Sequence, residues 1–160
     1  FVPAAGARPW LPPALVFVLG WLLHAAFLKQ PLSVVFDEVY FGRYAMLYLK
    51  GEDYFDLHPP LAKLVFGGMA WLLQLDPSFG WEHNGQPFPD PAYAWLRLPA
   101  HAMGVLLPVV LWGVAREIGL SPRAATVVAL LAALDNAFLV MSRVALTDMF
   151  FITAGFGALW

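Results

Sequence analysis

Four long apolar segments follow one another along the chain, and their lengths suggest helices that cross a membrane. A helix needs about 20 predominantly apolar residues to span about 30 Å of hydrocarbon. The segments cover residues 13–28, 94–115, 124–140 and 145–160. We therefore expect an all-α, polytopic membrane helical bundle, in which a long loop at residues 29–93 separates the first two spanning helices.

The long loop contains two further helical patterns. Between residues 36 and 50, bulky side chains recur at helical spacing, and several are tyrosines, which suit the headgroup region of a membrane. The second pattern, residues 61–75, follows a Pro-Pro pair that suits the first turn of a helix, but it is short for a span and carries Lys63. We expect both to form interfacial helices that lie along the membrane surface.

The positions of the arginines favour an interfacial placement of residues 61–75. If this segment does not cross the membrane, Arg116 and Arg123 fall on the same side as Arg8, as the positive-inside rule prefers. The stretch 76–93, which contains no lysine or arginine, then lies on the extracytoplasmic side. If the segment crosses instead, every assignment after it inverts.

Composition agrees with a membrane protein and excludes several other classes. Of 160 residues, 61% are hydrophobic and 12% are charged, and the mean hydropathy is +0.68. The net charge of -2 gives no polyanion-binding surface, so we expect no nucleic-acid partner. The chain contains no cysteine, which excludes disulfides, thiolate metal sites and a cysteine nucleophile. It runs from Phe1 to Trp160, and we expect it to be the N-terminal part of one longer domain whose C-terminal remainder is missing.

Adjacent carboxylates, Asp37 and Glu38, open the helical pattern at residues 36–50. The dipole of a helix favours anions at this end, so one interpretation is that both residues are solvated capping charges. In the expected topology they share the outer rim of the bilayer with several other polar residues. These are His58, Asp135, Arg143 and Asp148.

Three stretches carry a resemblance to a known family. They read "FDEVYFGRYAMLYLKGEDYFDLHPPLAKLVFG", "WLRLPAHAMGVLLP" and "LDNAFLVMSRVALTDMFF". In this order they resemble the N-terminal portion of the protein O-mannosyltransferase family, over residues 12–160. The resemblance implies a membrane glycosyltransferase of the GT-C fold. It implies an inverting transfer of mannose from a polyprenyl (dolichyl) phosphate to Ser or Thr hydroxyls of translocated proteins.

The resemblance also implies catalytic roles. Asp37 matches the family's catalytic aspartate, and a carboxylate there would take the proton of a serine hydroxyl as it attacks the anomeric carbon. Glu38, which we name as a second catalytic residue, points about 100° away around a helix. We therefore expect Glu38 to orient the loop or the acceptor. Its alternative role is a solvated cap.

The departing lipid phosphate needs cations or hydrogen-bond donors. Four residues on the outer side are candidates for this contact: His58, Lys63, Arg97 and Arg143. His58 precedes two prolines and a helix N-terminus that itself attracts phosphate. Lys63 has the alternative of snorkelling to lipid headgroups, and Arg143 that of a salt bridge with another helix. Arg97 should face protein or the donor, because an unpaired guanidinium facing lipid is costly.

Two further carboxylates resemble acidic positions of the family. We expect Asp148 to contribute to substrate binding by completing an acidic cavity with Asp37. Asp135, followed by Asn136, has the alternative of a helix end and turn. His24, His83 and His101 receive no role.

Cofactors and partners follow from the same resemblance. The set Asp37, Glu38, His58 and Asp148 would suit a hard divalent ion. The resemblance is to a metal-independent branch, however, so we expect no metal and no other cofactor. The expected partners are polyprenyl or dolichyl phosphate mannose, an acceptor polypeptide and the lipid bilayer, and a dimer with a copy or a paralogue stays open.

Two alternatives and the source of the protein remain open at this point. A related GT-C transferase could move another sugar, such as aminoarabinose, to a lipid or glycan, and a non-enzymatic transporter subunit would also carry intramembrane carboxylates. The clustering of carboxylates at one rim, without a broken-helix repeat, argues against the transporter. The composition, free of cysteine and rich in Ala, Gly and Leu, favours a bacterial plasma membrane over the endoplasmic reticulum, with the active site extracytoplasmic.

Overall fold

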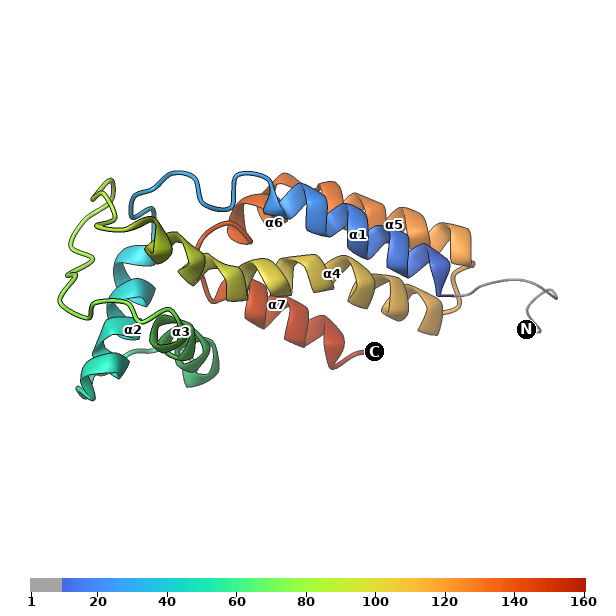
Figure 1. Cartoon of the computed structure of the whole chain (residues 1–160). Coiled ribbons are helices and arrows are strands. Elements are labelled where there is room, and N and C mark those ends of the chain that lie inside the picture. Colours follow the sequence, from blue (N-terminus) through green and yellow to red (C-terminus); the bar gives the residue numbers. More distant parts are fainter. Residues whose placement is uncertain (1–9) are drawn as a thin grey trace.

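Four helices run along the long axis of the molecule and form a bundle (Figure 1). The computed structural model describes residues 10–160, so Arg8 lies outside the described residues. The bundle consists of α1 (Leu11–Ala25), α4 (Leu98–Glu117), α5 (Pro122–Leu134) and α7 (Asp148–Gly157). Helix α4 packs against the other three and is therefore the centre of the bundle.

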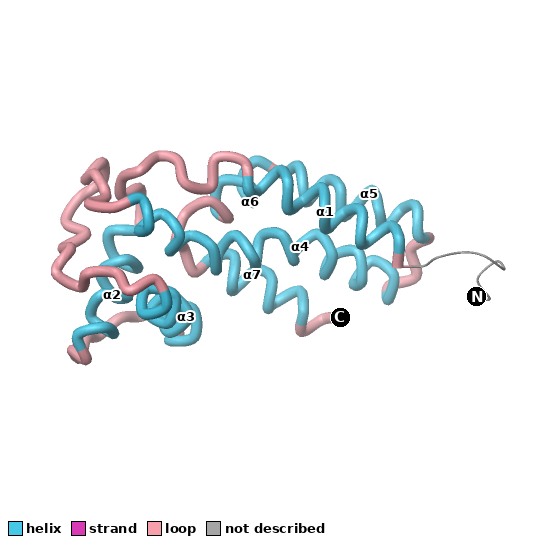
Figure 2. Tube along the Cα trace, viewed as in Figure 1, coloured by secondary structure: helices cyan, strands magenta, loops and turns pink. Residues whose placement is uncertain are grey.

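The remaining helices gather at one end of this bundle. They are α2 (Glu38–Lys50), α3 (Pro60–Leu72), the 3₁₀ helix η1 (Pro91–Arg97) and the short α6 (Asn136–Met141). Long connections join them at the same end, as Figure 2 shows. Among residues 10–160 there is no β-strand, and one isolated bridge pairs Ser33 with Pro87. The expected all-α class is therefore what the described residues have.

Local sequence signals explain where the helices begin and end. Helices α1, α3, α4 and α5 each carry proline in the first turn, where its missing N–H would have no helical partner anyway. Helix α2 ends at Gly51, which adopts a left-handed conformation with φ of 68° that glycine accepts without steric cost. The chain breaks again at Asp135, whose backbone is extended.

The break at Asp135 corrects the expected third spanning helix, residues 124–140. The structure has two helices there, because the side chain of Asp135 accepts hydrogen bonds from the backbone N–H groups of Ala137 and Phe138, at 2.9 and 3.2 Å, and starts α6. The last helix also starts later than expected, at Asp148 instead of residue 145. Both shifts place polar side chains at helix ends, at the same end of the bundle as α2 and α3.

One helical stretch in the described part of the chain, Pro91–Glu117, is long and apolar enough by itself to cross a membrane. Helices α1, α3 and α5 are apolar but shorter, at 15, 13 and 13 residues. With a rise of about 1.5 Å per residue, α1 is roughly 22 Å long, less than the hydrocarbon thickness of about 30 Å. Four spanning helices therefore remain a prediction.

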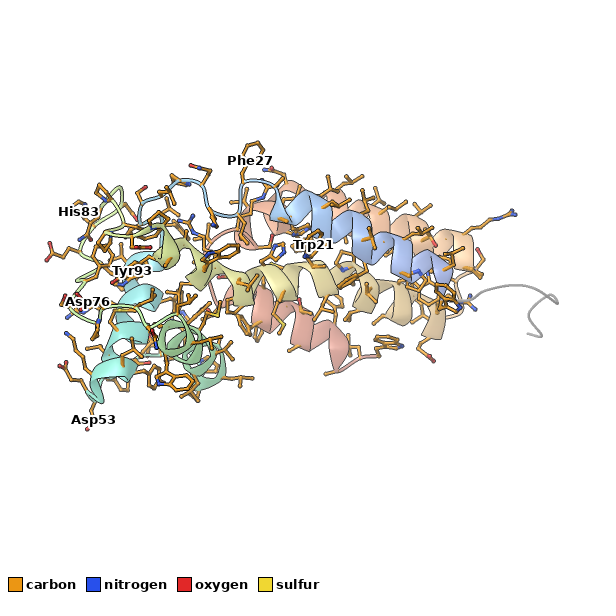
Figure 3. All side chains as sticks on the ribbon, viewed as in Figure 1. Trp21, Phe27, Asp53, Asp76, His83 and Tyr93 are labelled. Atoms are coloured by element: carbon orange, nitrogen blue, oxygen red, sulfur yellow. The ribbon has the colours of Figure 1, made fainter. Side chains whose placement is uncertain are left out.

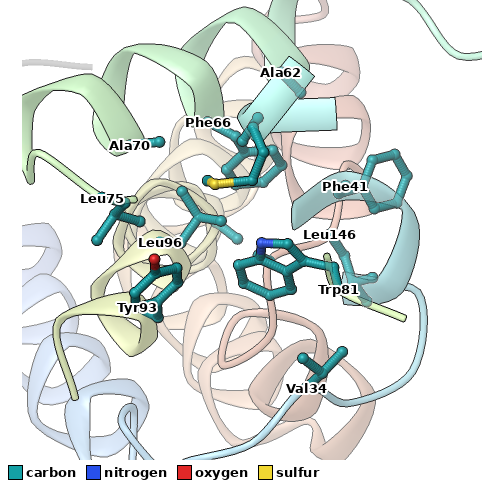
Figure 4. Close-up of a cluster of buried hydrophobic side chains, with 14 residues drawn as sticks. Val34, Phe41, Ala62, Phe66, Ala70, Leu75, Trp81, Tyr93, Leu96 and Leu146 are labelled. Atoms are coloured by element: carbon teal, nitrogen blue, oxygen red, sulfur yellow. The ribbon is translucent and has the colours of Figure 1, made fainter. Parts of the chain in front are cut away.

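The end of the bundle that carries α2 and α3 has its own hydrophobic core (Figure 4). Trp81, from the loop before η1, is 1% exposed and packs among Phe79, Phe88 and Tyr93. Its ring lies so close to α2 that a Cβ atom at Gly42 would collide with it. Residues 29–93 thus form a packed unit that contributes most of this core.

Helix α3 lies across the bundle axis and is seen almost end-on when α4 lies in the plane (Figure 1). The polar side chains of Asp53, Asp76 and His83 project from this end of the molecule (Figure 3). The turn between α4 and α5, which contains residues 118–121, lies at the opposite end. The interfacial placement of α3 stays a prediction.

Candidate functional site

A cavity of about 400 Å³ opens where the N-terminal ends of α2, α3 and α7 approach one another. Asp37, His58 and Asp148 all line it. These three residues come from widely separated parts of the chain, and the sequence analysis placed all three in the site. The rest of the lining is mainly apolar: Phe41, Pro59, Leu61, Ala62, Thr147, Phe150, Phe151, Ile152 and Ala154.

Asp37 is half-buried and immediately precedes α2. Its backbone carbonyl accepts the N–H of Phe41 at 3.1 Å and so begins the helix, but its side chain makes no capping hydrogen bond. The capping interpretation therefore does not describe this carboxylate. Phe36, just before it, has a φ of 50°, a conformation that costs a non-glycine residue about 1–3 kcal/mol. With no capping hydrogen bond, the side chain of Asp37 stays available in the cavity that it lines.

His58 is the one predicted phosphate-binding residue that lines the cavity. Its Nδ1 atom lies 3.0 and 3.2 Å from the two carboxylate oxygens of Asp56. The ring of Phe41 meets the imidazole edge-on, with centroids 5.3 Å apart. The following Pro-Pro pair starts α3, whose first-turn residues Leu61 and Ala62 also line the cavity. His58 therefore stands beside a helix N-terminus, where anions are favoured.

Lys63 has a different environment from the one we expected. It is 4% exposed, and its Nζ atom donates hydrogen bonds to Asp56 Oδ2 and to the His58 carbonyl, each at 2.7 Å. The rings of Tyr44 and Tyr54 lie 5.6 and 5.5 Å from the same nitrogen. The predicted contact with donor phosphate and the alternative of snorkelling are both corrected, because Asp56 neutralises this charge inside the protein.

Asp56 is the residue that the sequence analysis missed. Burial acts to raise the pKa of its carboxyl, but the hydrogen bonds from Lys63 and His58 outweigh burial and lower that pKa to about 2. Asp56 is therefore ionised at any physiological pH. It lies in a loop with no hydrophobic period. The one sequence feature that could have pointed to it is its position two residues before His58, which allows the two side chains to meet.

Glu38 and Arg97 form a buried ion pair, and each is 1% exposed. Arg97 donates from Nε to Glu38 Oε1 at 2.7 Å and from a terminal nitrogen to Oε2 at 2.9 Å. Glu38 also accepts the backbone N–H groups of Val35 and Ala145, each at 3.0 Å. Its carboxylate is fully occupied by protein groups, so Glu38 is not a solvated cap and has no oxygen free to react. Its bonds to Val35 and Arg97 agree with the expected role of orienting the loop before α2.

Arg97 does not face the cavity either. Its remaining N–H groups donate to the carbonyls of Pro31 and Ser33 at 2.9 and 3.0 Å, and more weakly to that of Leu28 at 3.4 Å. These contacts hold the segment between α1 and α2 against η1. Of the two environments expected for Arg97, protein or donor phosphate, the structure has the first, because every N–H group of the guanidinium already has a protein partner.

Arg143 and Asp135 also serve the scaffold. Arg143 donates to the carbonyls of Leu23 and His24 at 2.7 and 3.4 Å, where α1 ends. A cation at this position satisfies carbonyls that a helix C-terminus leaves free. Asp135 caps α6. Arg143 does not line the cavity, so its substrate contact stays a prediction, whereas Asp135 has the turn role that we gave as its alternative.

The cavity is consequently acidic and apolar. Its lining contains two carboxylates and one imidazole, but no lysine or arginine. The three predicted cations, Lys63, Arg97 and Arg143, are used by other groups. In such a site Asp37 can accept a proton from a substrate hydroxyl. His58 and the first turn of α3 can bind an anion.

The fold and the site define an all-helical protein with acid–base groups collected at one end of its bundle. A family model described as dolichyl-phosphate-mannose-protein mannosyltransferase matches residues 14–160. The chain belongs to this family, which confirms the resemblance found in the sequence.

Individual relatives agree. The chain is 37% identical over 143 residues to dolichyl-phosphate-mannose--protein mannosyltransferase 1 of Saccharomyces cerevisiae, covering 87% of this chain and 17% of that protein. Protein O-mannosyltransferase 1 of Drosophila melanogaster is 32% identical over 141 residues, covering 87% and 16%. The chain thus spans less than a fifth of these relatives. Both organisms are eukaryotes, so the comparisons give no support to the bacterial source that we favoured.

A solved structure has the same arrangement of helices. It is described as S. cerevisiae protein O-mannosyltransferase Pmt1-Pmt2 complex bound to the sugar donor, and it matches with a TM-score of 0.87 at 31% identity. The match covers 98% of this chain and 22% of that chain. The packed unit at residues 29–93 is therefore part of the shared fold.

Proposed function

We propose that this chain is the N-terminal part of a GT-C type enzyme that transfers mannose, with inversion, from a polyprenyl or dolichyl phosphate to Ser or Thr hydroxyls of proteins. The observation that carries the proposal is the meeting of Asp37, His58 and Asp148 in one cavity. Family membership supplies the donor and the acceptor class. No metal or other cofactor enters the proposal.

The cavity supports a direct displacement at the anomeric carbon. Asp37 accepts the proton of the acceptor hydroxyl, whose oxygen forms the new bond to the carbon. The bond to the donor phosphate oxygen breaks on the opposite face, and the phosphate leaves with the electron pair. His58 and the N–H groups at the start of α3 stabilise the charge that develops on it. Asp148 can accept a hydrogen bond from a hydroxyl of the sugar or the acceptor.

Residues outside 10–160 are needed in this mechanism to stabilise the leaving phosphate. A leaving phosphate is best stabilised by cations, and the residues that line the described cavity include none besides His58 when it is protonated. We propose that lysine or arginine side chains from outside residues 10–160 complete the phosphate site. Activity is therefore expected of the whole protein.

We propose that the cavity end of the bundle faces the extracytoplasmic or lumenal side of the membrane. Helices α1, α4, α5 with α6, and α7 would cross it, with α2 and α3 in the interface. Arg116 and Arg123, beside the turn at the opposite end, then follow the positive-inside rule. The relatives do not decide between a plasma membrane and the endoplasmic reticulum for this chain.

Photocrosslinking tests whether the donor binds in this cavity. A benzophenone amino acid would replace Phe151, a cavity residue that is 79% exposed in the described chain. In the full-length protein we expect it to capture a radiolabelled polyprenyl phosphate mannose under light, with yields that fall on addition of unlabelled donor.

The matched control carries the same group at Leu131 of α5, which is 67% exposed and outside the cavity. Capture there should be weak and insensitive to unlabelled donor, since only passing lipid would be labelled. Equal, non-competed labelling at both positions would rule out this cavity as the donor site.

A further inference from the structure

The side chains of Asp56, His58 and Lys63 form a connected group beside the cavity. His58 borders two hollows: the acid–base cavity of about 400 Å³ and a neighbouring one of about 490 Å³. Asp56 and Lys63 border the second alone. Asp56 is therefore placed to act on a ligand in the acid–base cavity through His58.

The contacts of this group run from two buried side chains, Lys63 and Asp56, to the more exposed side chain of His58. The side chains of Lys63 and Asp56 are 5% and 8% exposed, whereas that of His58 is 53% exposed. Lys63 Nζ donates a hydrogen bond to Asp56 Oδ2 at 2.7 Å, and Asp56 Oδ1 lies 3.0 Å from His58 Nδ1. An exposed imidazole without such a partner would sample several rotamers. With Nδ1 engaged, Nε2 is the ring nitrogen left to meet a ligand.

We propose that Asp56, anchored by Lys63, is a positioning residue that sets the orientation of His58 so that Nε2 addresses the departing phosphate. This inference rests on the proposed function. A protonated His58 donates Nδ1–H to Asp56 and Nε2–H to a phosphate oxygen, and so places one positive charge between two anions. At metal sites, mutation of the carboxylate that holds a ligand histidine by its second nitrogen typically costs about 10–100-fold in affinity or activity, and we expect an effect at the lower end of this range here.

A double-mutant cycle on the full-length enzyme separates this role from a purely structural one. Asp56→Asn keeps the size of the side chain and is expected to lower kcat/KM for the polyprenyl phosphate donor by about 10-fold. His58→Ala should lower it at least as much. In the His58→Ala background, Asp56→Asn should cost little more, because the residue through which Asp56 acts is gone. Equal costs in both backgrounds would overturn the proposal.

Two replacements of His58 give an independent test that leaves Asp56 and the fold of its loop untouched. The amide of Gln reaches the position of Nε2, and that of Asn reaches the position of Nδ1. His58→Gln should therefore keep more donor kcat/KM than His58→Asn. The opposite order would overturn the proposal even if Asp56→Asn failed to fold.

These outcomes are distinct from failure of the proposed function. If the wild-type enzyme transfers mannose and loses transfer on changing Asp37, the function stands whatever the cycle shows. If His58→Ala lowers donor kcat/KM but the Asp56 effect is additive, the positioning role alone is refuted.

Discussion

Replacing Asp37 by Asn in the full-length enzyme is expected to lower turnover by about 10²-fold or more while donor binding is largely kept. Asn preserves the size of the side chain and its hydrogen bonding but cannot accept the proton of the acceptor hydroxyl. The fold should tolerate the change, because helix α2 is begun by the backbone carbonyl of Asp37 and not by its side chain. The measurement is kcat and KM for the donor, at matched levels of folded protein.

Asp53→Asn is the matched control for this experiment. Asp53 is exposed at the same end of the molecule, lies outside the acid–base cavity and should be replaceable without loss of transfer. Near-normal transfer by Asp37→Asn would show that the general base has been assigned to the wrong carboxylate. Asp148, the second acid in the cavity, would then be the residue to examine.

The largest effect on stability is expected from breaking the pair of Glu38 and Arg97. Glu38→Ala leaves a guanidinium buried at 1% exposure without its counter-charge, and losing one partner of such a pair typically costs about 3–5 kcal/mol. The loss should appear as a lower unfolding temperature in detergent and a lower yield of folded protein. Arg43→Met, which removes an exposed arginine from α2, should change stability by less than about 0.5 kcal/mol.

Glu38→Gln distinguishes the structural role from the catalytic one suggested by the sequence. It weakens the bonds from Arg97 while keeping the side-chain volume, so we expect reduced stability and a loss of activity that follows the loss of folded protein. A Glu38→Gln enzyme with wild-type stability and greatly reduced kcat would contradict the structural assignment. It would return Glu38 to the catalytic group.

The sequence predicts the helices well because their signals are local. Apolar periodicity and first-turn prolines place the ends of α1 to α4 within four residues of those observed, whereas the predicted end of α5 lies six residues too far along the chain. The break before α6 was harder to foresee, because the apolar run continues on both sides of Asp135. Only the capping hydrogen bonds to Ala137 and Phe138 reveal why the helix stops there.

The predictions about the site likewise depend on whether the signal in the sequence is local. Asp37 and Asp148 could be named because they match acidic positions of the family, and His58 because it precedes a helix N-terminus on the same side of the expected topology. The partners of the cations could not be read from the sequence, since Arg97 and Glu38 are 59 positions apart and pair only through tertiary structure. Charge alone made Arg97 and Lys63 resemble phosphate ligands, whereas burial beside a carboxylate makes them part of the scaffold.

A transfer assay on the full-length protein tests the central claim most directly. Purified enzyme would receive polyprenyl phosphate mannose, radiolabelled in the sugar, together with a peptide that contains Ser and Thr and a control peptide in which both are Ala. We expect label on the hydroxyl-bearing peptide alone, in a linkage of inverted anomeric configuration. Label on a lipid or glycan instead of the peptide, or no transfer by folded enzyme with its complete chain, would contradict this expectation.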